Sequence, residues 1–266
     1  MSSSIGPYAL SQKWVEIDEE VCTVRIYNVN TEKIILSEFN PDAAEHELVE
    51  ISGVPGRHFP VRLSFLKPAG SISGQLFPTG NKNDLVTLDE GTRFQATLID
   101  VTVPCIIISA EEAGIRGDED YSTLMARRTY VKMMTELRVK ASITMKLCLD
   151  KNEARLLRTN VPNIIVISPV QNGLTGVAAR YVSCDKPHRA APVTASMALA
   201  AACCTEGTIA IFSAKKADEE FIYHSSGTIS VKVEVAKDGE ILSTSVVRTM
   251  RFIMRGEIIA NIPIEH

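Results

Sequence analysis

Alternation of apolar and polar positions is the dominant pattern along this chain, and it predicts a protein built largely from β-strands. Clear examples are 21–27 and 33–39, which a short polar turn separates, and 61–66. Further along, Asp238-Gly239 lies between two alternating runs, a combination typical of a tight β-hairpin. The alternation continues through 246–260, which predicts two strands near the end of the chain.

Helical spacing of apolar residues occurs in fewer places. From about 118 to 150 the apolar positions recur every three or four residues with Arg and Lys between them, which predicts one or two amphipathic helices. The segment 190–204 is rich in alanine and predicts a helix of small residues. Because strands can approach such a helix closely on every side, the pattern favours an α+β fold in which a sheet curls around it.

Composition places the chain among ordinary globular proteins. Of its 266 residues 45% are apolar and 23% are charged, which is enough for a substantial core. The net charge of −4 and the absence of a Lys/Arg-rich run argue against nucleic acid as a partner. We find no apolar run long enough for a membrane span and no secretory signal, so we expect a cytoplasmic protein. The six cysteines lack the paired spacing of zinc ligands, so we expect no metal.

Candidate chemistry lies in two glycine-containing loops. The first, Pro78-Thr79-Gly80-Asn81, precedes a strand-like segment at 85–88. Proline fixes φ and glycine permits a positive φ, so this loop is shaped and can direct backbone N–H groups at a carboxylate or phosphate. The second, His224-Ser225-Ser226-Gly227-Thr228, precedes an alternating strand at 229–235. For the first loop, an ordinary hairpin turn is the alternative that the spacing alone favours.

Taken together, the two loops resemble the PrpF family, whose members carry Phe-Pro-Thr-Gly-Asn and, more than a hundred residues later, His-Pro-Ser-Gly-Thr. Three further stretches fit the family in the same order: 92–100, 103–110, and 186–194 with the helix that follows it. The resemblance covers nearly the whole chain. It departs from the family at Ser225, where proline is common, and this puts the rigidity of the second loop in doubt.

The resemblance implies a diaminopimelate-epimerase-like fold, in which two similar domains each wrap a sheet around a central helix and the substrate lies between the helix N-termini. We expect residues 98–245 to form the second domain around the helix at 190–204. Residues 1–97 and 246–266 are then expected to form an incomplete first domain. The reason for this expectation is a set of apolar side chains that lack upstream strands to pack against: Ile5, Tyr8, Leu10 and Trp14.

The family is one of isomerases that shift a carbon–carbon double bond in 2-methylaconitate or aconitate by a 1,3-proton transfer, without a cofactor. The resemblance assigns this proton transfer to a lysine and to the cysteine of a Gly-Asn-Cys-Gly-Asn motif. Both precede the family segment that Met1–Leu10 resembles, so we expect this chain to lack the family's N-terminal part. It would then contain no catalytic residue and be inactive alone.

The remaining residues are expected to bind the carboxylates of a small tricarboxylate. The expected substrate-binding residues are Thr79, Gly80, Asn81, His188, Ser225, Ser226, Gly227 and Thr228. A helix cap is an equal alternative for His188, and a structural loop position is the favoured alternative for His224. Two other functions stay open, a non-catalytic remnant or binding protein and an amino-acid epimerase. Cys203 and Cys204 lie deep in the predicted helix, which disfavours the epimerase. A homodimer is left open.

Overall fold

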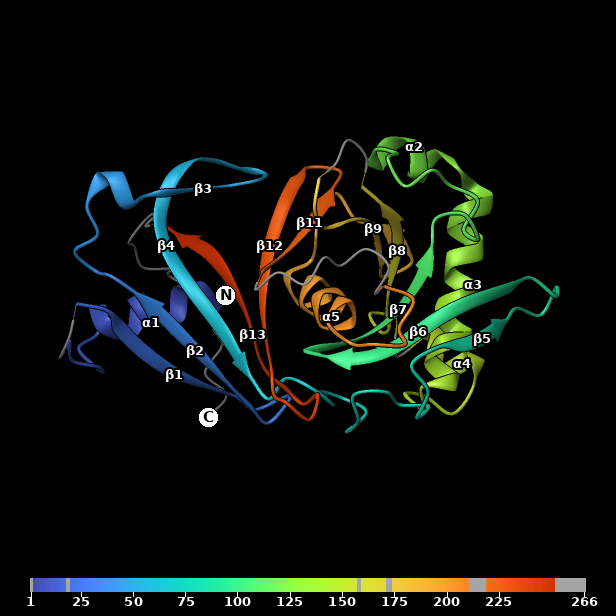
Figure 1. Ribbon diagram of the computed structural model, residues 1–266, viewed down its shortest axis with the longest axis horizontal. Helices are drawn as coiled ribbons and strands as arrows, with labels where there is room; N and C mark the ends of the chain where they lie inside the picture. The colour runs from blue at the N-terminus through green and yellow to red at the C-terminus, as the bar shows by residue number, and fades with distance from the viewer. Residues whose placement is uncertain (1, 18–19, 157–158, 171–173, 211–218, 252–266) are drawn as a thin grey trace, which may run out of the picture.

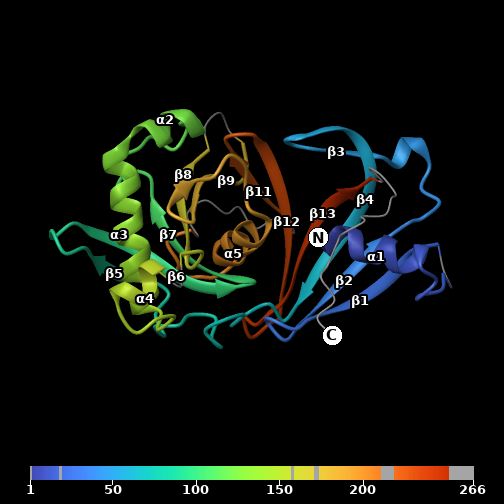
Figure 2. The same cartoon turned by 180° about the vertical axis from the view of Figure 1, so that it is seen from behind.

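The computed structural model describes residues 2–17, 20–156, 159–170, 174–210 and 219–251. Within them, thirteen strands form a sheet that runs from one end of the molecule to the other (Figure 1). The path of neighbouring strands is β1-β2-β4-β13-β12-β11-β9-β8-β7-β6-β5, with β3 on β4 and β10 on β9. Two helices, α1 and α5, each lie against part of this sheet, and they divide the molecule into two halves (Figures 1 and 2).

The α1 half lies at the left of Figure 1. Its helix contacts the four strands β1, β2, β4 and β13. The elements of this half are α1 (Ser2–Ser11), β1 (Cys22–Asn28), β2 (Lys33–Phe39), the 3₁₀ turn η1 (Glu45–Glu47), β3 (Val49–Ile51), β4 (Val54–Leu66) and β13 (Ile241–Met250).

The α5 half contains the longer stretch of sheet and the remaining helices. Its strands are β5 (Asp84–Thr87), β6 (Arg93–Val101), β7 (Val103–Ser109), β8 (Asn163–Pro169), β9 (Val177–Ser183), β10 (Lys186–Pro187), β11 (Glu219–His224) and β12 (Gly227–Val235). Its helices are α2 (Tyr121–Ala126), α3 (Arg128–Thr144), α4 (Lys151–Leu156) and α5 (Val193–Cys203).

The alternating runs form the strands that the sequence predicts. β1 and β2 pair antiparallel from Cys22 opposite Phe39, and the turn before β13 contains Gly239 at φ +90°. The predicted strand 61–66 is the second part of β4, whose first part contains Pro55 and Pro60. Those prolines lack a backbone N–H and concealed the longer strand from the pattern. β13 ends at Met250, and residues 252–266 lie outside the described part.

Small side chains explain how the sheet closes around α5. Every residue from Ala195 to Cys203 is buried, and the helix contacts β6, β7, β8, β11, β12 and β13. An alanine methyl group lets a strand backbone approach the helix axis closely, so strands can surround the helix. The predicted helix and the curled-sheet α+β fold are confirmed.

The sheet continues from one half to the other through β13, which pairs with β4 on one edge and β12 on the other. β5 pairs with β6 and so belongs with the α5 half. The division of the chain into domains at 97/98 and 245/246 stays a prediction.

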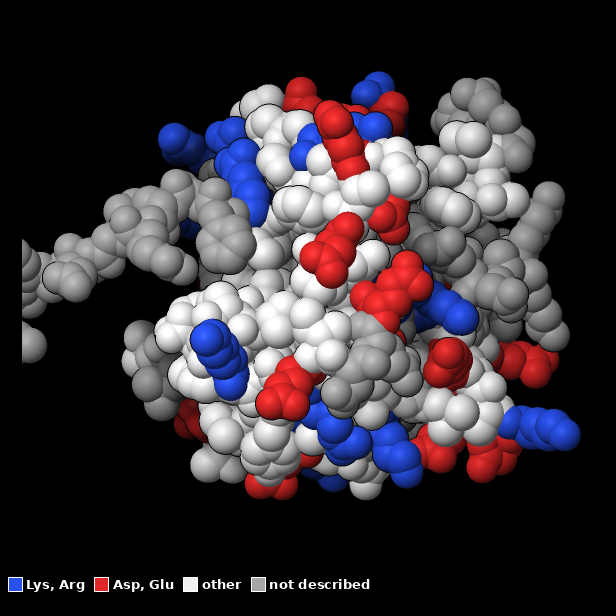
Figure 3. Space-filling model, turned by 90° about the vertical axis from the view of Figure 1, so that its left-hand side faces the viewer, with Lys and Arg blue, Asp and Glu red and all other residues white. Residues whose placement is uncertain are grey.

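Charged side chains of both signs are mixed on the one face that Figure 3 presents. On the end of the molecule that carries α1, Figure 3 shows acidic and basic side chains interspersed among uncharged ones. Within the described ranges, no helix combines the length and the hydropathy that a membrane crossing needs. The same residues contain no group of three or more His, Cys, Asp or Glu side chains that could hold a metal ion.

Candidate functional site

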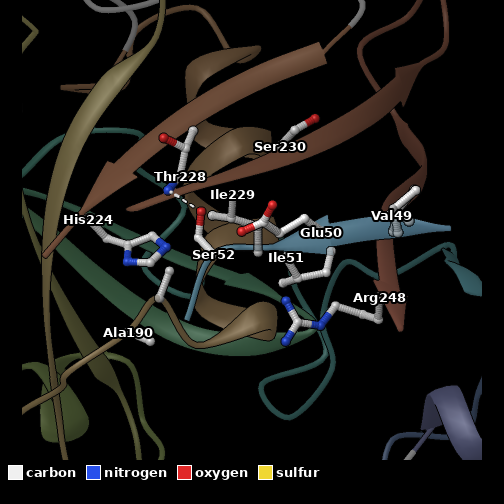
Figure 4. Close-up of a pocket in the computed structure, with 12 residues that line it drawn as sticks. Val49, Glu50, Ile51, Ser52, Ala190, His224, Thr228, Ile229, Ser230 and Arg248 are labelled. Carbon is white, nitrogen blue, oxygen red and sulfur yellow. Dashed lines mark hydrogen bonds between the residues drawn. The ribbon is translucent and has the colours of Figure 1, made fainter. Parts of the chain in front are cut away.

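A pocket of about 330 Å³ lies where the two halves meet. This is within the size range of small-molecule sites. Its walls come from β3, from β12 and β13, and from the segment that leads into α5 (Figure 4). The lining residues are Val49, Glu50, Ile51, Ser52, Ala190, Ala191, His224, Thr228, Ile229, Ser230, Val247 and Arg248.

One side of the pocket is closed by a contact between the two halves. The backbone N–H of Thr228 donates to Oγ of Ser52 at 3.1 Å, which joins the start of β12 to the tip of the β3–β4 hairpin (Figure 4). Gly227 has φ +132°, and a Cβ at this position would lie 2.4 Å from the Ser52 hydroxyl oxygen. A glycine is therefore needed here both for its backbone conformation and for the close approach.

His224 lies at the end of β11 with its ring at the pocket. Burial, together with the positive charges of Arg180 and Arg248, lowers the pKa of His224 to about 4. The imidazole is thus neutral at pH 7. Its Nδ1 accepts the backbone N–H of Ser226 at 3.2 Å, which leaves the proton of the neutral ring on Nε2.

Two half-buried guanidinium groups supply positive charge near His224. Arg180 is held in place by backbone carbonyls, with Nε donating to Glu119 at 2.7 Å and Nη1 to Ala179 at 2.9 Å. Arg248 projects from β13 and lines the pocket directly. Burial lowers the pKa of both guanidinium groups, since a low-dielectric environment disfavours the charged form.

The serine hydroxyls of the second loop do not lie free to bind a ligand. Oγ of Ser225 and Oγ of Ser226 both donate to the backbone oxygen of Arg189, at 2.8 Å and 2.5 Å. They fix the segment that leads into α5, and each hydroxyl proton is already donated to protein. Their contact with substrate stays a prediction. Gly227 and Thr228 do lie beside the pocket, but the N–H of Thr228 is taken by Ser52.

His188 is exposed and bonded to its own turn. Its Nδ1 lies 2.7 Å from the backbone oxygen of Ala190, and its N–H donates to the oxygen of Tyr181. Ala190 and Ala191, rather than His188, line the pocket. His188 does not cap α5, because the N-cap residue of this helix is Pro192 and no side chain caps it. The contact of His188 with substrate stays a prediction.

The first loop, Pro78–Asn81, does not line this pocket. Thr79 Oγ1 and Asn81 Nδ2 both donate to the carboxylate of Asp84, at 2.7 Å and 2.9 Å, and Gly80 has φ +82°. Thr97 connects this loop to the region after α5, because its hydroxyl donates to the oxygen of Lys82 and accepts the N–H of Ile209.

The two loops therefore lie at opposite ends of α5. The second loop bonds to Arg189, before the helix, and the first bonds through Thr97 to Ile209, after it. The pocket described above is lined by residues of the second loop and by none of the first, and a cleft shared by both loops stays a prediction. The polar groups of the first loop satisfy one another, as in an ordinary turn.

The sequence reasoning missed Glu50, Ser52 and Arg248. Each lies in or beside an unremarkable alternating segment, so no local motif distinguishes it. Only the pairing of β3 with β4, and of β4 with β13, brings these side chains to the pocket.

No lysine or cysteine is among the described residues that line this pocket. Cys203 is buried in the last turn of α5, and burial raises the pKa of its thiol well above the ordinary value. An amino-acid epimerase of the two-cysteine type needs thiols at the site, so these positions give that alternative no support.

Comparisons with known proteins match nearly the whole chain. A family model described as PrpF protein matches residues 1–261. YbhH of Escherichia coli (strain K12) is 32% identical over 264 residues, covering 97% of this chain and 72% of YbhH. The 2-methyl-aconitate isomerase of Shewanella oneidensis is 28% identical, covering 96% of this chain and 71% of that protein. The crystal structure of a methylitaconate-delta-isomerase matches with a TM-score of 0.83 at 25% identity, covering 96% of this chain and 70% of that one.

Proposed function

This chain belongs to the PrpF protein family, and we propose that it serves the shift of a carbon–carbon double bond in an aconitate-type tricarboxylate. Relatives named as isomerases of 2-methyl-aconitate and of methylitaconate support an isomerase of this reaction class. Those two names differ in the number of carboxylates, three in the first and two in the second. Our proposal takes the tricarboxylate as the substrate.

Moving a double bond by one position is a 1,3-proton transfer. A base removes an acidic C–H proton, an acid delivers a proton to the far carbon, and donors stabilise the dienolate that forms between the two steps. The carboxylates also need donors, because an anionic ligand leaves water on entering the pocket.

The observation that carries the proposal is that His224 and the half-buried guanidinium of Arg248 line the same pocket. A guanidinium that forms no ion pair among the described residues, together with an N–H donor, suits an anionic substrate. His224 accepts from Ser226 through Nδ1, so its Nε2–H is available to donate to a carboxylate or dienolate oxygen.

We further propose that the 266-residue chain binds this substrate without turning it over. Among the lining residues only Glu50, His224 and Arg248 carry ionisable side chains. A histidine with a pKa of about 4 is a weak base at neutral pH, and a guanidinium does not give up its proton. The resemblance to the family assigns the proton transfer to a lysine and a cysteine that this pocket does not contain.

The test uses the purified chain with cis- and trans-aconitate. Isothermal titration calorimetry should detect binding, whereas proton NMR in D₂O should show neither isomerisation nor deuterium exchange at the substrate carbons. Exchange catalysed by the chain alone would place proton-transfer groups within these 266 residues. Failure to bind either aconitate would refute the proposed substrate class.

The second candidate is a binding protein of the same fold. The absence of lysine and cysteine from the described pocket lining favours it. The two candidates differ when an upstream family segment with its lysine and cysteine is joined to the chain. An isomerase would gain turnover, and a binding protein would not.

A further inference from the structure

Among the described residues, Arg248 differs from the other two arginines that are buried or half-buried, Arg138 and Arg180. Arg138 forms an ion pair with Asp185, with Nε 2.6 Å from Oδ1. Arg180 donates to the carbonyls of Glu119 and Ala179. Within the described residues, no hydrogen bond or ion pair is found for the Arg248 side chain, although it is half-buried.

An unpaired, half-buried guanidinium is energetically unfavourable. Removing a charge from water costs free energy unless a counter-charge or hydrogen bonds replace the lost hydration. Glu50 lines the same pocket and is exposed, yet the two side chains form no ion pair within 4.0 Å. The positive charge of Arg248 therefore stays available to an anion that enters the pocket.

The position of Arg248 separates it from the other donor in the pocket. Arg248 lies on β13, opposite Val61 of β4, whereas His224 ends β11 (Figure 4). β12 runs between these two strands. A ligand that reaches both donors must carry acceptor groups at separate points, as a polycarboxylate does.

We propose that Arg248 is the specificity-determining residue of this pocket, binding the carboxylate that distinguishes a tricarboxylate from a dicarboxylate. The inference rests on the proposed function and narrows its substrate class. A guanidinium can donate two parallel N–H groups to one carboxylate, so it recognises the shape as well as the charge of that group. Loss of Arg248 then removes more affinity from a ligand with three carboxylates than from one with two.

The experiment measures binding by calorimetry at fixed ionic strength for two non-reacting probes, tricarballylate with three carboxylates and glutarate with two. In Arg248→Gln the affinity for tricarballylate should fall about 10- to 100-fold, the effect of losing hydrogen bonds to a charged group. The affinity for glutarate should fall by a smaller factor. Arg248→Lys keeps the charge but loses the paired donors, and should give an intermediate loss of tricarballylate affinity.

Arg62→Gln is the matched control, because Arg62 is exposed on β4, the strand beside β13, and does not line the pocket. It should leave both affinities unchanged. If the wild-type chain binds and Arg248→Gln keeps the same ratio of tricarballylate to glutarate affinity, Arg248 has no such role while the proposed function stands. A wild-type chain that binds neither probe overturns both. If Arg248→Gln does not fold, an unchanged ratio in Arg248→Lys also overturns the role of Arg248.

Discussion

The two central helices of this molecule have contrasting surroundings. α5 is contacted by six strands, and its residues from Ala195 to Cys203 are all buried. α1 is contacted by four strands, and Ile5 and Tyr8 remain 41% and 52% exposed. On its covered side α1 approaches β2 closely, since a Cβ on Gly6 would lie 2.6 Å from the Ser37 hydroxyl oxygen.

The contrast shows that a helix can have one face of small residues without being surrounded by strands on every side. Close approach needs a small residue only where one strand crosses, as at Gly6. Full enclosure needs small residues around the entire helix, as in α5. The α1 half therefore leaves an apolar surface uncovered, to which Trp14, 70% exposed and edge-on to Tyr8, also belongs.

The largest expected effect compares matched leucines on the two helices. Leu199→Ala in α5 should lower the free energy of unfolding by about 2–5 kcal/mol, because the surrounding strands cannot collapse into the space. Leu10→Ala in α1, at a partly exposed position, should cost about 1 kcal/mol or less. Urea unfolding of both variants measures the difference. Equal losses would mean that α1 is as enclosed in solution as α5.

The contact that joins the halves provides the second prediction. Gly227→Ala should destabilise the protein by about 1–3 kcal/mol, because of its positive φ and the approach to Ser52. Gly239→Ala is the control, since Gly239 also has a positive φ but has open space around it. Adding Ser52→Gly to Gly227→Ala should recover part of the loss. No recovery in thermal unfolding would indicate that backbone conformation alone explains the effect.

The third prediction concerns how the stability of the protein depends on pH through His224, which lines the pocket between the two halves. The pKa of His224 is about 4 in the folded protein, against an ordinary value near 6.5 in the unfolded chain. Between these values the unfolded chain binds a proton that the folded protein does not, so stability should fall as pH drops from about 6.5 to about 4.

Solvent screening at this half-buried site reduces the expected loss to about 1–2 kcal/mol. Unfolding titrations across this pH range should show a shallower decline in His224→Gln. His46→Gln, which removes an exposed imidazole from η1, should retain the wild-type decline. Identical profiles for wild type and His224→Gln would show that other groups govern the acid response.

The smallest effect is expected on the open face of α1. Tyr8→Ser should change the free energy of unfolding by less than about 0.5 kcal/mol, because the side chain is already half exposed. The free energy of unfolding should be measured at low and high protein concentration. A decrease of more than about 1 kcal/mol would contradict the exposure of this face of α1. Dependence of that loss on concentration would identify a second copy as the cover.

Local patterns were sufficient for most of the secondary structure. Alternation at 21–27 and 33–39, the Asp238-Gly239 turn and the alanine run of α5 each depend on interactions within a few residues. Such features are readable because the side-chain period and the turn chemistry are set by the local backbone. The first part of β4 was missed because its prolines mimic an interruption.

The site was harder to predict, because residues with similar local sequences have different partners. Both glycine loops were candidates for binding an anion, although the spacing of the first favoured an ordinary hairpin turn. One proved to be closed by Asp84, and the hydroxyls of the other hold the segment that leads into α5. A hydroxyl or amide donor in the sequence does not reveal whether protein or ligand accepts its hydrogen bond.

The sequence by itself determined which segments become strands, where the chain turns and which helix is surrounded, because these follow from periodicity and side-chain size. Only the tertiary structure decided which polar groups meet. Ser52 and Thr228 are 176 positions apart, and their contact depends on the pairing of β4 with β13 and of β13 with β12. Arg248 likewise gains its place beside His224 from strand order. Strand order reflects the packing of the whole sheet, which no local pattern encodes.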